Sequence, residues 1–382
     1  MPRNPLPIPE PARFAPLFLL LALLAGCASW RAAAPGREPD EPGTQGPMLA
    51  DTPLDPPRIR EAFITPRSPA DEFDSPTAWS APGGGRWLIG TAKKTHQLVV
   101  FDGETGALLR RVGGRGAEPG RFDRPNGVFA WGDRLFVAER DNRRVQVLAL
   151  PDFTPLATFG EAELRSPYGL WLHEPEAGTL EVWVTDSYME GERHETVPGL
   201  AKLDARLKRY TLLVDGDAVS ARFAGAAGDT SPAGALRVVE SVVGDPGHGR
   251  LLVAEEDVPT GTGYRVYDLE GRYGGRDMGV GDFLAQAEGL ALWACPDGSG
   301  VWIGADQFHD RTVFRVFDRA TLAPRGQFAG EATSLTDGVW LSQTPSARFP
   351  AGVLYASNGD AAFSAFDWRD IARTLGLPER CP

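Results

Sequence analysis

Leu251-Leu252-Val253-Ala254-Glu255-Glu256-Asp257 is one of six versions of a pattern in which a short apolar strand runs into polar residues. The other five begin at Trp87, Leu135, Val182, Val301 and Val353, at a spacing of about 50 residues with one longer gap before Leu251. A short strand that recurs six times at this interval is typical of a propeller, in which each repeat forms one blade. We therefore predict an all-β fold, a six-bladed β-propeller.

A second landmark, a turn followed by another short strand, stands about ten residues before each of these strands. Its versions are Pro76-Thr77-Ala78-Trp79, Pro125-Asn126-Gly127-Val128, Pro167-Tyr168-Gly169-Leu170, Val239-Glu240-Ser241-Val242, Ala287-Glu288-Gly289-Leu290 and Thr336-Asp337-Gly338-Val339. The first strand of each propeller blade lines the central channel, so we expect these positions to form a ring near the channel mouth.

The two ends of the ring are expected to join. After residues 363–366 the sixth repeat has no outer strand, and residues 368–375 read as a short helix with Asp367 as N-cap and Gly376 at its end. We predict that residues 59–65 supply the missing strand, so that an N-terminal strand closes the last blade. Cys295 and Cys381 either form a disulfide or remain two free thiols; the sequence does not decide.

The N-terminus has the pattern of an export signal. Arg3 and Arg13 precede an apolar run over 14–25, which ends in Leu24-Ala25-Gly26-Cys27 and resembles a bacterial lipoprotein signal. We predict a signal peptide over 1–26, a disordered tether from lipidated Cys27 over 27–57 and the propeller over 58–382. Ordinary signal-peptide cleavage is the alternative. Ala28, rather than Asp, follows the cysteine, which favours anchoring at the outer membrane of a bacterial cell envelope.

Charge is divided unevenly around the expected ring. The net charge of -12 argues against a nucleic-acid partner, whose phosphates need a basic surface. Blades one to three place cations and neutral donors near the mouth, namely Lys93, Lys94, Asn126, Arg143 and Tyr168. Blades four to six place acids there, namely Glu240, Glu255, Glu256, Asp257, Glu288, Asp306 and Asp337.

Such a cluster of carboxylates is suited to a hard divalent cation such as Ca²⁺, which takes oxygen ligands in flexible geometry. Lysine, arginine and tyrosine on the opposite side offer donors to a phosphate. For any single acid, capping a turn is the structural alternative. The five histidines show no metal-ligand spacing, and no Gly-x-Ser-x-Gly elbow is present.

The order of these landmarks resembles that of the β-propeller phytases, calcium-dependent phosphatases that hydrolyse phytate. The resemblance covers residues 71–375. It is carried by Asp71-Glu72-Phe73-Asp74-Ser75-Pro76, Thr91-Ala92-Lys93-Lys94, Asn142-Arg143, Tyr168-Gly169, Glu240, Ala254-Glu255-Glu256-Asp257, Glu288-Gly289-Leu290, Thr336-Asp337-Gly338, Phe349-Pro350-Ala351-Gly352 and Asp367-Trp368-Arg369-Asp370-Ile371-Ala372.

The resemblance implies calcium as cofactor and a phosphorylated small molecule as substrate, bound by a monomer. Glu240, Glu256 and Glu288 would be catalytic, and the implied metal ligands are Asp74, Glu240, Glu255, Glu256, Glu288 and Asp337. The residues implied to bind substrate phosphates are Lys93, Lys94, Arg143 and Tyr168.

Three residues depart from the family pattern at acidic positions: Ser75, Gln286 and Leu335 stand where the family has Asp. A further family lysine in blade three has no counterpart. We expect weaker metal binding, slower turnover or a different phosphate ester as a result.

Two other functions fit a six-bladed propeller. Residues 122–147 resemble an NHL repeat, and NHL propellers mostly bind rather than catalyse. The first alternative is therefore a non-catalytic propeller at the cell envelope that binds a partner or glycan. A calcium-dependent lactonase would also use acids at the channel mouth. Lys93, Lys94 and Arg143 favour phosphate chemistry over lactone chemistry, which needs no cations there.

Overall fold

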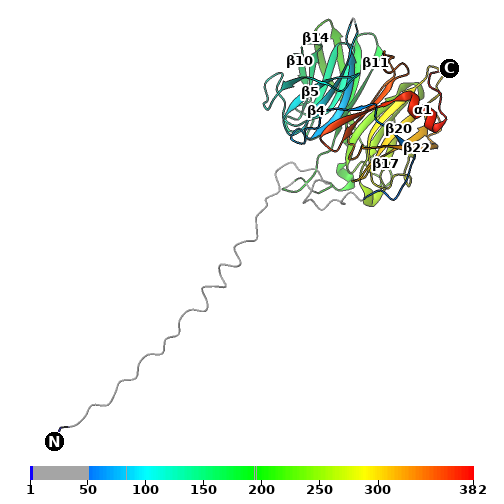
Figure 1. Ribbon diagram of the computed structural model, residues 1–382. Coiled ribbons are helices and arrows are strands. Elements are labelled where there is room, and N and C mark those ends of the chain that lie inside the picture. The colour runs from blue at the N-terminus through cyan, green and yellow to red at the C-terminus, as the bar shows by residue number, and fades with distance from the viewer. Residues whose placement is uncertain (3–50, 83, 193, 195) are drawn as a thin grey trace.

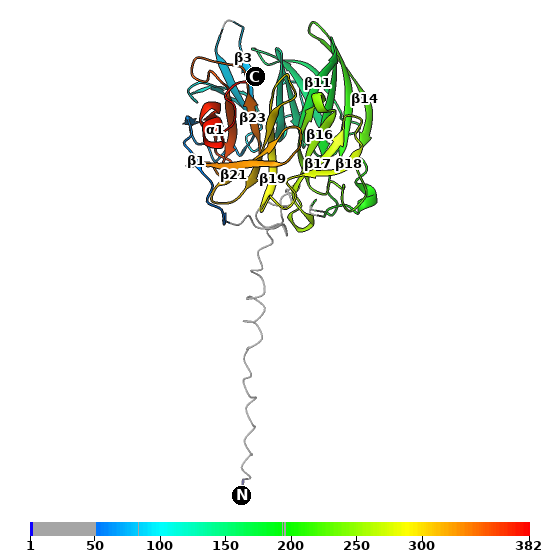
Figure 2. The same cartoon turned by 90° about the vertical axis from the view of Figure 1, so that its right-hand side faces the viewer.

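The structure, a computed structural model, describes residues 1, 2 and 51–382 except 83, 193 and 195. These residues form six small sheets in a ring, so the predicted all-β, six-bladed propeller is confirmed (Figures 1 and 2). In Figure 1 the red strands of the last blade lie beside the blue strands of the first, and β3 contacts both β23 and β24.

Each blade is built from consecutive strands that run from the channel outwards. Blade one contains β3 (Phe73–Ser80), β4 (Arg86–Ala92), β5 (Gln97–Asp102) and β6 (Leu108–Gly113). Blade two contains β7 (Pro125–Trp131), β8 (Arg134–Glu139), β9 (Arg144–Ala149) and β10 (Thr154–Phe159). Blade three contains β11 (Pro167–Glu176), β12 (Thr179–Asp186), β13 (Leu207–Asp215) and β14 (Ala218–Ala227). Blades four and five contain β15 (Val239–Asp245), β16 (Arg250–Glu255), β17 (Gly263–Asp268), β18 (Tyr273–Met278); and β19 (Gln286–Ala294), β20 (Gly300–Gln307), β21 (Thr312–Asp318), β22 (Pro324–Gly330). Blade six contains β23 (Val339–Ser342), β24 (Val353–Asn358) and β25 (Ala362–Asp367).

The core lies between adjacent blades. Ile89 and Val100 of blade one pack with Val128 and Val137 of blade two in a single buried cluster. Because neighbouring blades cover both faces of each sheet, a second strand such as β16 is buried along its whole length. This explains the near-continuous apolar runs in the sequence, in which each buried Val or Leu contributes about 1.5–3 kcal/mol.

The N-terminal segment closes the ring by pairing with two blades. Strand β2 (Phe63–Ile64) pairs antiparallel with β25 and supplies the outer strand of blade six, as predicted. The pairing extends to Thr65, whose N–H donates to the Phe363 carbonyl at 2.9 Å. Strand β1 (Arg58–Ile59) instead runs parallel to β22 at the edge of blade five. The predicted 59–65 strand is therefore divided between the last two blades.

The C-terminus is held against blade five. Helix α1 (Trp368–Leu375) has Asp367 as N-cap, which accepts a hydrogen bond from the Arg369 N–H, and ends at Gly376 in the left-handed conformation, as predicted. Trp368 stacks on Trp293 with ring centroids 4.8 Å apart. Cys295 and Cys381 form a disulfide. The red helix lies at the outer side of the ring in Figure 2.

The segment before the propeller also contacts blade five where it is described. Within residues 51–57, the Thr52 N–H donates to Asp310 Oδ1 at 2.7 Å, and the Pro57 carbonyl accepts from the Ala329 N–H at 3.0 Å. The predicted signal peptide, Cys27 and tether residues up to 50 lie outside the described residues. No helix in the described part of the chain has the length and apolarity to cross a membrane.

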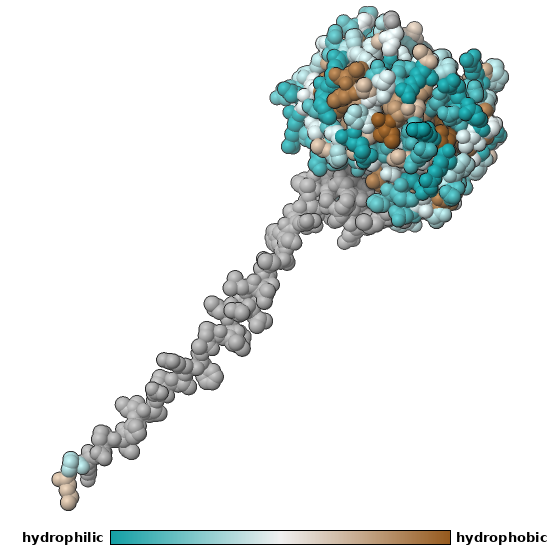
Figure 3. All heavy atoms as spheres, in the orientation of Figure 1, coloured by the Kyte–Doolittle hydropathy of each residue, from teal (hydrophilic) through white to brown (hydrophobic). Residues whose placement is uncertain are grey.

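Polar side chains dominate the surface. On the face shown in Figure 3, apolar side chains form small separate patches among hydrophilic ones. Among the described residues, the large apolar side chains that are exposed are those of Met1, Ile64, Leu108, Leu109, Leu213, Phe223, Val280 and Leu284.

Candidate metal centre

A repeated irregularity of the inner strands positions the residues of the channel mouth. In blades one to five, the pairing of the first two strands skips two residues at the same place, as between Val239 and Val242 in blade four. A bulge of this kind bends the strand and redirects its side chains. The residues in these five bulges that form the ring are Asp74, Asn126, Tyr168, Glu240 and Glu288, and Asp337 precedes the inner strand of blade six.

Adjacent blades fix the bulges by backbone contact. A Cβ added to Gly169 would lie 2.5 Å from the Glu240 carbonyl oxygen, so only glycine fits beside the next blade. The Thr185 hydroxyl of blade three donates to that same carbonyl at 2.5 Å. The Tyr264 hydroxyl of blade four donates to the Glu288 carbonyl at 3.0 Å in the same way. Each blade thereby sets the position of the next ring residue.

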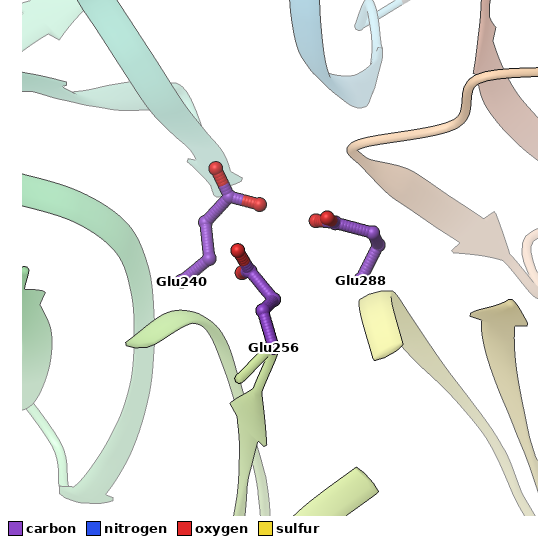
Figure 4. A group of neighbouring side chains, drawn as sticks. All are labelled: Glu240, Glu256 and Glu288. Atoms are coloured by element: carbon purple, nitrogen blue, oxygen red, sulfur yellow. The ribbon is translucent and has the colours of Figure 1, made fainter. Parts of the chain in front are cut away.

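Three glutamates from two blades converge at the mouth (Figure 4). One carboxylate oxygen from each of Glu240, Glu256 and Glu288 lies within 4.8 Å of the other two. Glu240 is partly buried, whereas Glu256 and Glu288 are buried. Ca²⁺–oxygen distances are about 2.3–2.6 Å, so oxygens on opposite sides of one ion are about 5 Å apart. The spacing of this Glu triad therefore suits a single calcium ion.

The electrostatics of the triad favour a cation. Burial, followed by the negative charges of Glu256 and Glu240, raises the pKa of Glu288 well above its usual value. A charged Glu288 is thus unfavourable unless positive charge is added. Its Oε2 atom has no hydrogen-bond partner among the described residues, although Glu288 is only 2% exposed.

Two aspartates of the ring share a lysine beside the triad. Lys93 Nζ lies 3.2 Å from Asp74 Oδ2 and 3.4 Å from Asp337 Oδ2. Asp337 Oδ1 accepts a hydrogen bond from Gln307 Nε2 at 2.5 Å. Burial raises the pKa of Asp337 well above its usual value, against the lowering effect of Lys93. Of the acids that the resemblance implied as metal ligands, Asp74 and Asp337 are therefore already paired with a cation.

The set of donors at the mouth fits calcium. Buried amide oxygens add to the carboxylates, because Oε1 of Gln286 and of Gln307 has no hydrogen-bond partner among the described residues. Hard oxygen ligands of this kind suit Ca²⁺ rather than zinc, which prefers nitrogen and sulfur. Gln286 stands where the phytase pattern has Asp, and its amide would offer a neutral oxygen in place of a charged one.

Glu255 is not a member of the Glu triad, and its carboxylate is engaged by the backbone instead. Its carboxylate accepts hydrogen bonds from the N–H groups of Arg237, Val238 and Asp257 at 2.6, 3.1 and 3.0 Å. Burial raises the pKa of Glu255 to about 7 in spite of these bonds. Glu255 holds the segment that leads into the inner strand of its own blade.

Asp306 has the same structural role in blade five. Its carboxylate accepts from the N–H groups of Leu284 and Ala285 and pairs with Arg315 at 2.6 Å. The Asp257 carboxylate forms a hydrogen bond within its own loop, since its Oδ2 atom accepts from the Thr260 hydroxyl at 2.5 Å. The turn-capping alternative therefore describes both Glu255 and Asp306.

The predicted phosphate-binding cations separate in the structure. Lys93 is buried at the mouth, but the Lys94 side chain is 67% exposed and lies 3.9 Å from Glu72. Arg143 is exposed on the turn between β8 and β9, with a φ of 54°. Lys94 and Arg143 are therefore exposed, whereas Lys93 is buried.

Arg140 is the buried cation that the sequence reading missed. It follows β8 directly, as Lys93 follows β4 and Glu256 follows β16, and it is 7% exposed. The strand pairing identifies Arg140. Glu139 and Glu255 are paired at equivalent places opposite the bulges of their blades, so Arg140, the residue after Glu139, corresponds to Glu256, the residue after Glu255. Gln307, the last residue of β20, was missed for the same reason.

Neutral donors complete the mouth on the side of blades two and three. Asn126 is 1% exposed, and neither atom of its side-chain amide has a hydrogen-bond partner among the described residues. Tyr168, in the next bulge, is also buried. Their positions in the ring agree with those expected from the sequence.

The channel below the ring is an apolar cavity of about 270 Å³. Its wall begins with residues that directly follow the ring residues, such as Gly127, Gly169 and Ser241. It continues along the inner strands with Val128, Phe129, Leu170, Trp171, Val242, Val243, Leu290, Leu292, Val339, Trp340 and Leu341. A polar mouth thus lies directly above an apolar interior.

Comparison with known proteins identifies no family for the chain. No protein-family model matches the chain, and no curated protein matches it. The hydrazine synthase of Kuenenia stuttgartiensis is similar in structure, with 12% identity, a TM-score of 0.44, and coverage of 87% of this chain and 82% of that one. A chain of a nidogen/laminin complex shows 16% identity, a TM-score of 0.46, and coverage of 69% and 82%. Function must therefore be inferred from the site.

Proposed function

We propose that this propeller is a calcium-dependent phosphomonoesterase that hydrolyses phytate or another phosphate ester. The observation that carries the proposal is the buried Glu triad, whose ligand oxygens lie within 4.8 Å of one another. By itself, the triad of acids would suit a metal site in a protein of any function. The basic and amide groups on the same mouth, Lys93, Arg140 and Asn126, extend the inference to a phosphate ligand.

Glu240, Glu256 and Glu288 would hold the calcium ion in this proposal. When bound, calcium would supply Lewis-acid chemistry, which withdraws charge from a phosphoryl oxygen and assists the deprotonation of water. Lys93, Arg140 and Tyr168 would hold the phosphate, and Asn126 would orient it with its amide. Arg140 takes the place of Arg143 in this assignment because Arg143 is exposed on a turn.

The carboxylates also have a place in proton transfer. Glu240 is the least buried member of the triad and therefore the one that a water beside the substrate can reach. Attack by this water on phosphorus forms a new P–O bond as the ester P–O bond breaks. The Glu240 carboxylate would accept the proton that the water loses. The leaving alkoxide would depart on the solvent side and take its proton from solvent water, which makes it an alcohol.

The experiment is phosphate release from phytate and from an aryl phosphate, measured with added calcium and then with excess chelator. Calcium-dependent release that is lost in Glu288→Gln, while circular dichroism is unchanged, is the expected result. Folded wild-type protein that releases no phosphate from either ester would contradict the proposal and favour a binding propeller of the NHL type.

The apolar cavity favours one second candidate, a calcium-dependent lactonase. A lactone with an aliphatic substituent would place its ester at the Glu triad and its chain among Val242, Leu290 and Val339 below. Phytate has no apolar part to fill this space. Calcium-dependent opening of an acyl lactone, by protein that is inactive on both phosphate esters, would select this candidate.

We also propose that the chain is attached to the bacterial cell envelope through lipidated Cys27, with the outer membrane as the favoured location, and that it acts as a monomer. The proposal is supported by the sequence Leu24-Ala25-Gly26-Cys27 alone. Mass spectrometry of the mature N-terminus tests it: an acylated cysteine is expected, and an unmodified one would contradict it.

A further inference from the structure

Lys93 occupies the position between Asp74 and Asp337 that a metal ion would take. Its ammonium lies within 3.4 Å of one oxygen of each aspartate, and its side chain is only 6% exposed. Both remaining oxygens have neutral donors, since Asp74 Oδ1 accepts from the Ser75 hydroxyl at 2.7 Å and Asp337 Oδ1 accepts from the Gln307 amide. The pair of aspartates is thus satisfied by one internal cation.

The neighbouring triad has a different charge balance. Three carboxylates approach one another there, and Figure 4 shows Glu288 directed towards Glu240 and Glu256. The buried Glu288 Oε2 atom has no hydrogen-bond partner in the described part of the chain. The same is true of Gln307 Oε1, although the Nε2 atom of that amide is bonded to Asp337. Blade five therefore carries two buried oxygens without hydrogen-bond partners in the described part of the chain, one in the triad and one beside Asp337.

Charge decides how many ions the mouth can hold. A divalent ion at the triad would lower its formal charge from three negative charges to one. A second divalent ion at the aspartates would have to enter beside the ammonium of Lys93, and like charges at this range in a buried site repel strongly. Removal of that ammonium would leave two buried aspartates with Gln307 Oε1 beside them, a set of oxygens suited to calcium.

We propose that the mouth binds one calcium ion, at Glu240, Glu256 and Glu288, and that Lys93 serves as the built-in cation of a second, latent site formed by Asp74, Asp337 and Gln307. Replacement of Lys93 by a neutral side chain converts the mouth from a one-ion to a two-ion site. This inference rests on the proposed metal centre and adds the number of ions that it binds. A phosphate would then be bound between one calcium ion at the triad and the ammonium of Lys93.

The test is the calcium stoichiometry of the purified full-length chain, measured by equilibrium dialysis and by calorimetric titration. We expect one ion in the wild type and two in Lys93→Met. Lys93→Arg, which keeps the charge, and Lys94→Met, which removes the exposed neighbouring charge, should each bind one. A double variant, Lys93→Met with Asp74→Asn, should return to one ion and would locate the second ion at the aspartates.

The outcomes separate this inference from the proposed function. One ion in both the wild type and folded Lys93→Met would overturn the role of Lys93 and leave the triad site standing. Two ions in the wild type would overturn it as well, because the ammonium would then not exclude a second ion. No binding by the wild type would overturn the metal centre itself. If Lys93→Met does not fold, Lys93→Gln carries the same expectation.

Discussion

Glu255 and Glu256 are consecutive in the chain, yet their carboxylates have separate functions in the structure. Glu255 accepts three backbone N–H groups and fixes the path into the inner strand of blade four. Glu256 joins Glu240 and Glu288 at the channel mouth. Strand β16 ends between them, at Glu255, so one residue holds the blade together and the next faces the site.

This division predicts opposite effects for substitution of the two neighbours. Glu255→Ala leaves three N–H groups without their acceptor, and we expect the free energy of unfolding to fall by about 2–4 kcal/mol. Calcium binding by the folded protein should not change. Glu256→Gln should weaken calcium binding at least tenfold with little loss of stability. Urea unfolding and calorimetric titration of both variants check the pair, and the reverse pattern would show that the two roles are exchanged.

Glu288→Gln is expected to stabilise the metal-free protein while it abolishes metal binding. The glutamine amide is neutral without taking up a proton, whereas Glu288 must either hold a proton or carry a buried negative charge that Glu256 and Glu240 repel. The midpoint of thermal unfolding should therefore rise in chelator, and added calcium should no longer increase it. A variant that is both destabilised in chelator and still stabilised by calcium would exclude Glu288 as a ligand.

Calcium affinity should rise with pH. The pKa of Glu288 is raised, so this carboxyl holds a proton in the metal-free folded protein at pH values where it is charged in the unfolded chain. This group consequently makes the metal-free protein more stable at low pH, and its contribution is lost as the pH rises through the folded-state pKa. Calcium must displace the proton, so binding releases protons. Titration calorimetry in two buffers of different ionisation enthalpy measures the release, which should diminish as the pH rises through the folded-state pKa of Glu288.

Arg140 and Arg143 form a matched test of the phosphate-binding side. We expect Arg140→Gln to raise KM for a phosphate ester about tenfold, because a charge-assisted hydrogen bond to phosphate is lost. The exposed Arg143→Gln should change KM less than twofold. Steady-state kinetics at saturating calcium provide the comparison. A larger increase in KM for Arg143→Gln than for Arg140→Gln would instead indicate that phosphate binds at the turn between β8 and β9.

The disulfide between Cys295 and Cys381 joins residues that are 86 apart in sequence. Cross-linking over a loop of this length restricts the unfolded chain, and Cys381→Ser should lower the free energy of unfolding by about 4 kcal/mol. Cys295 follows the end of β19, whereas Glu288 lies near the beginning of that strand, so the calcium stoichiometry should be unaffected. Unfolding in denaturant measures the loss. Two thiols that titrate in the folded wild type would contradict the bond.

The fold could be predicted from the sequence because its period is visible in every repeat. The second strands are buried on both faces, and this burial produces the apolar runs from which the six blades were counted. Glycine after the ring residue is also a consequence of packing, since a Cβ at Gly169 would meet the next blade. Part of the resemblance to phytases is therefore explained by the geometry of blade contacts, which requires no catalysis.

The candidate site could be predicted only in part. The ring positions of Glu240 and Glu288 follow from their place in the repeat. The difference between Glu255 and Glu256 does not, because it depends on which residue is paired opposite the bulge and which follows the strand. The sequence analysis likewise named Arg143 on the following turn rather than Arg140, which directly follows β8. Strand register determines on which side of a sheet a side chain lies, and a local motif does not contain that information.

The pairing of β2 with β25 has a consequence for synthesis of the chain. Ribosomes produce β2 before any blade exists, but its partner residue Ala365 is made after almost all of the propeller. The first strand must therefore stay unpaired while five blades form, and blade six keeps an open edge until both are present. Late, long-range pairing of this kind slows folding and exposes an edge to aggregation. Maturation of this protein is thus a single final event that joins its earliest and latest segments.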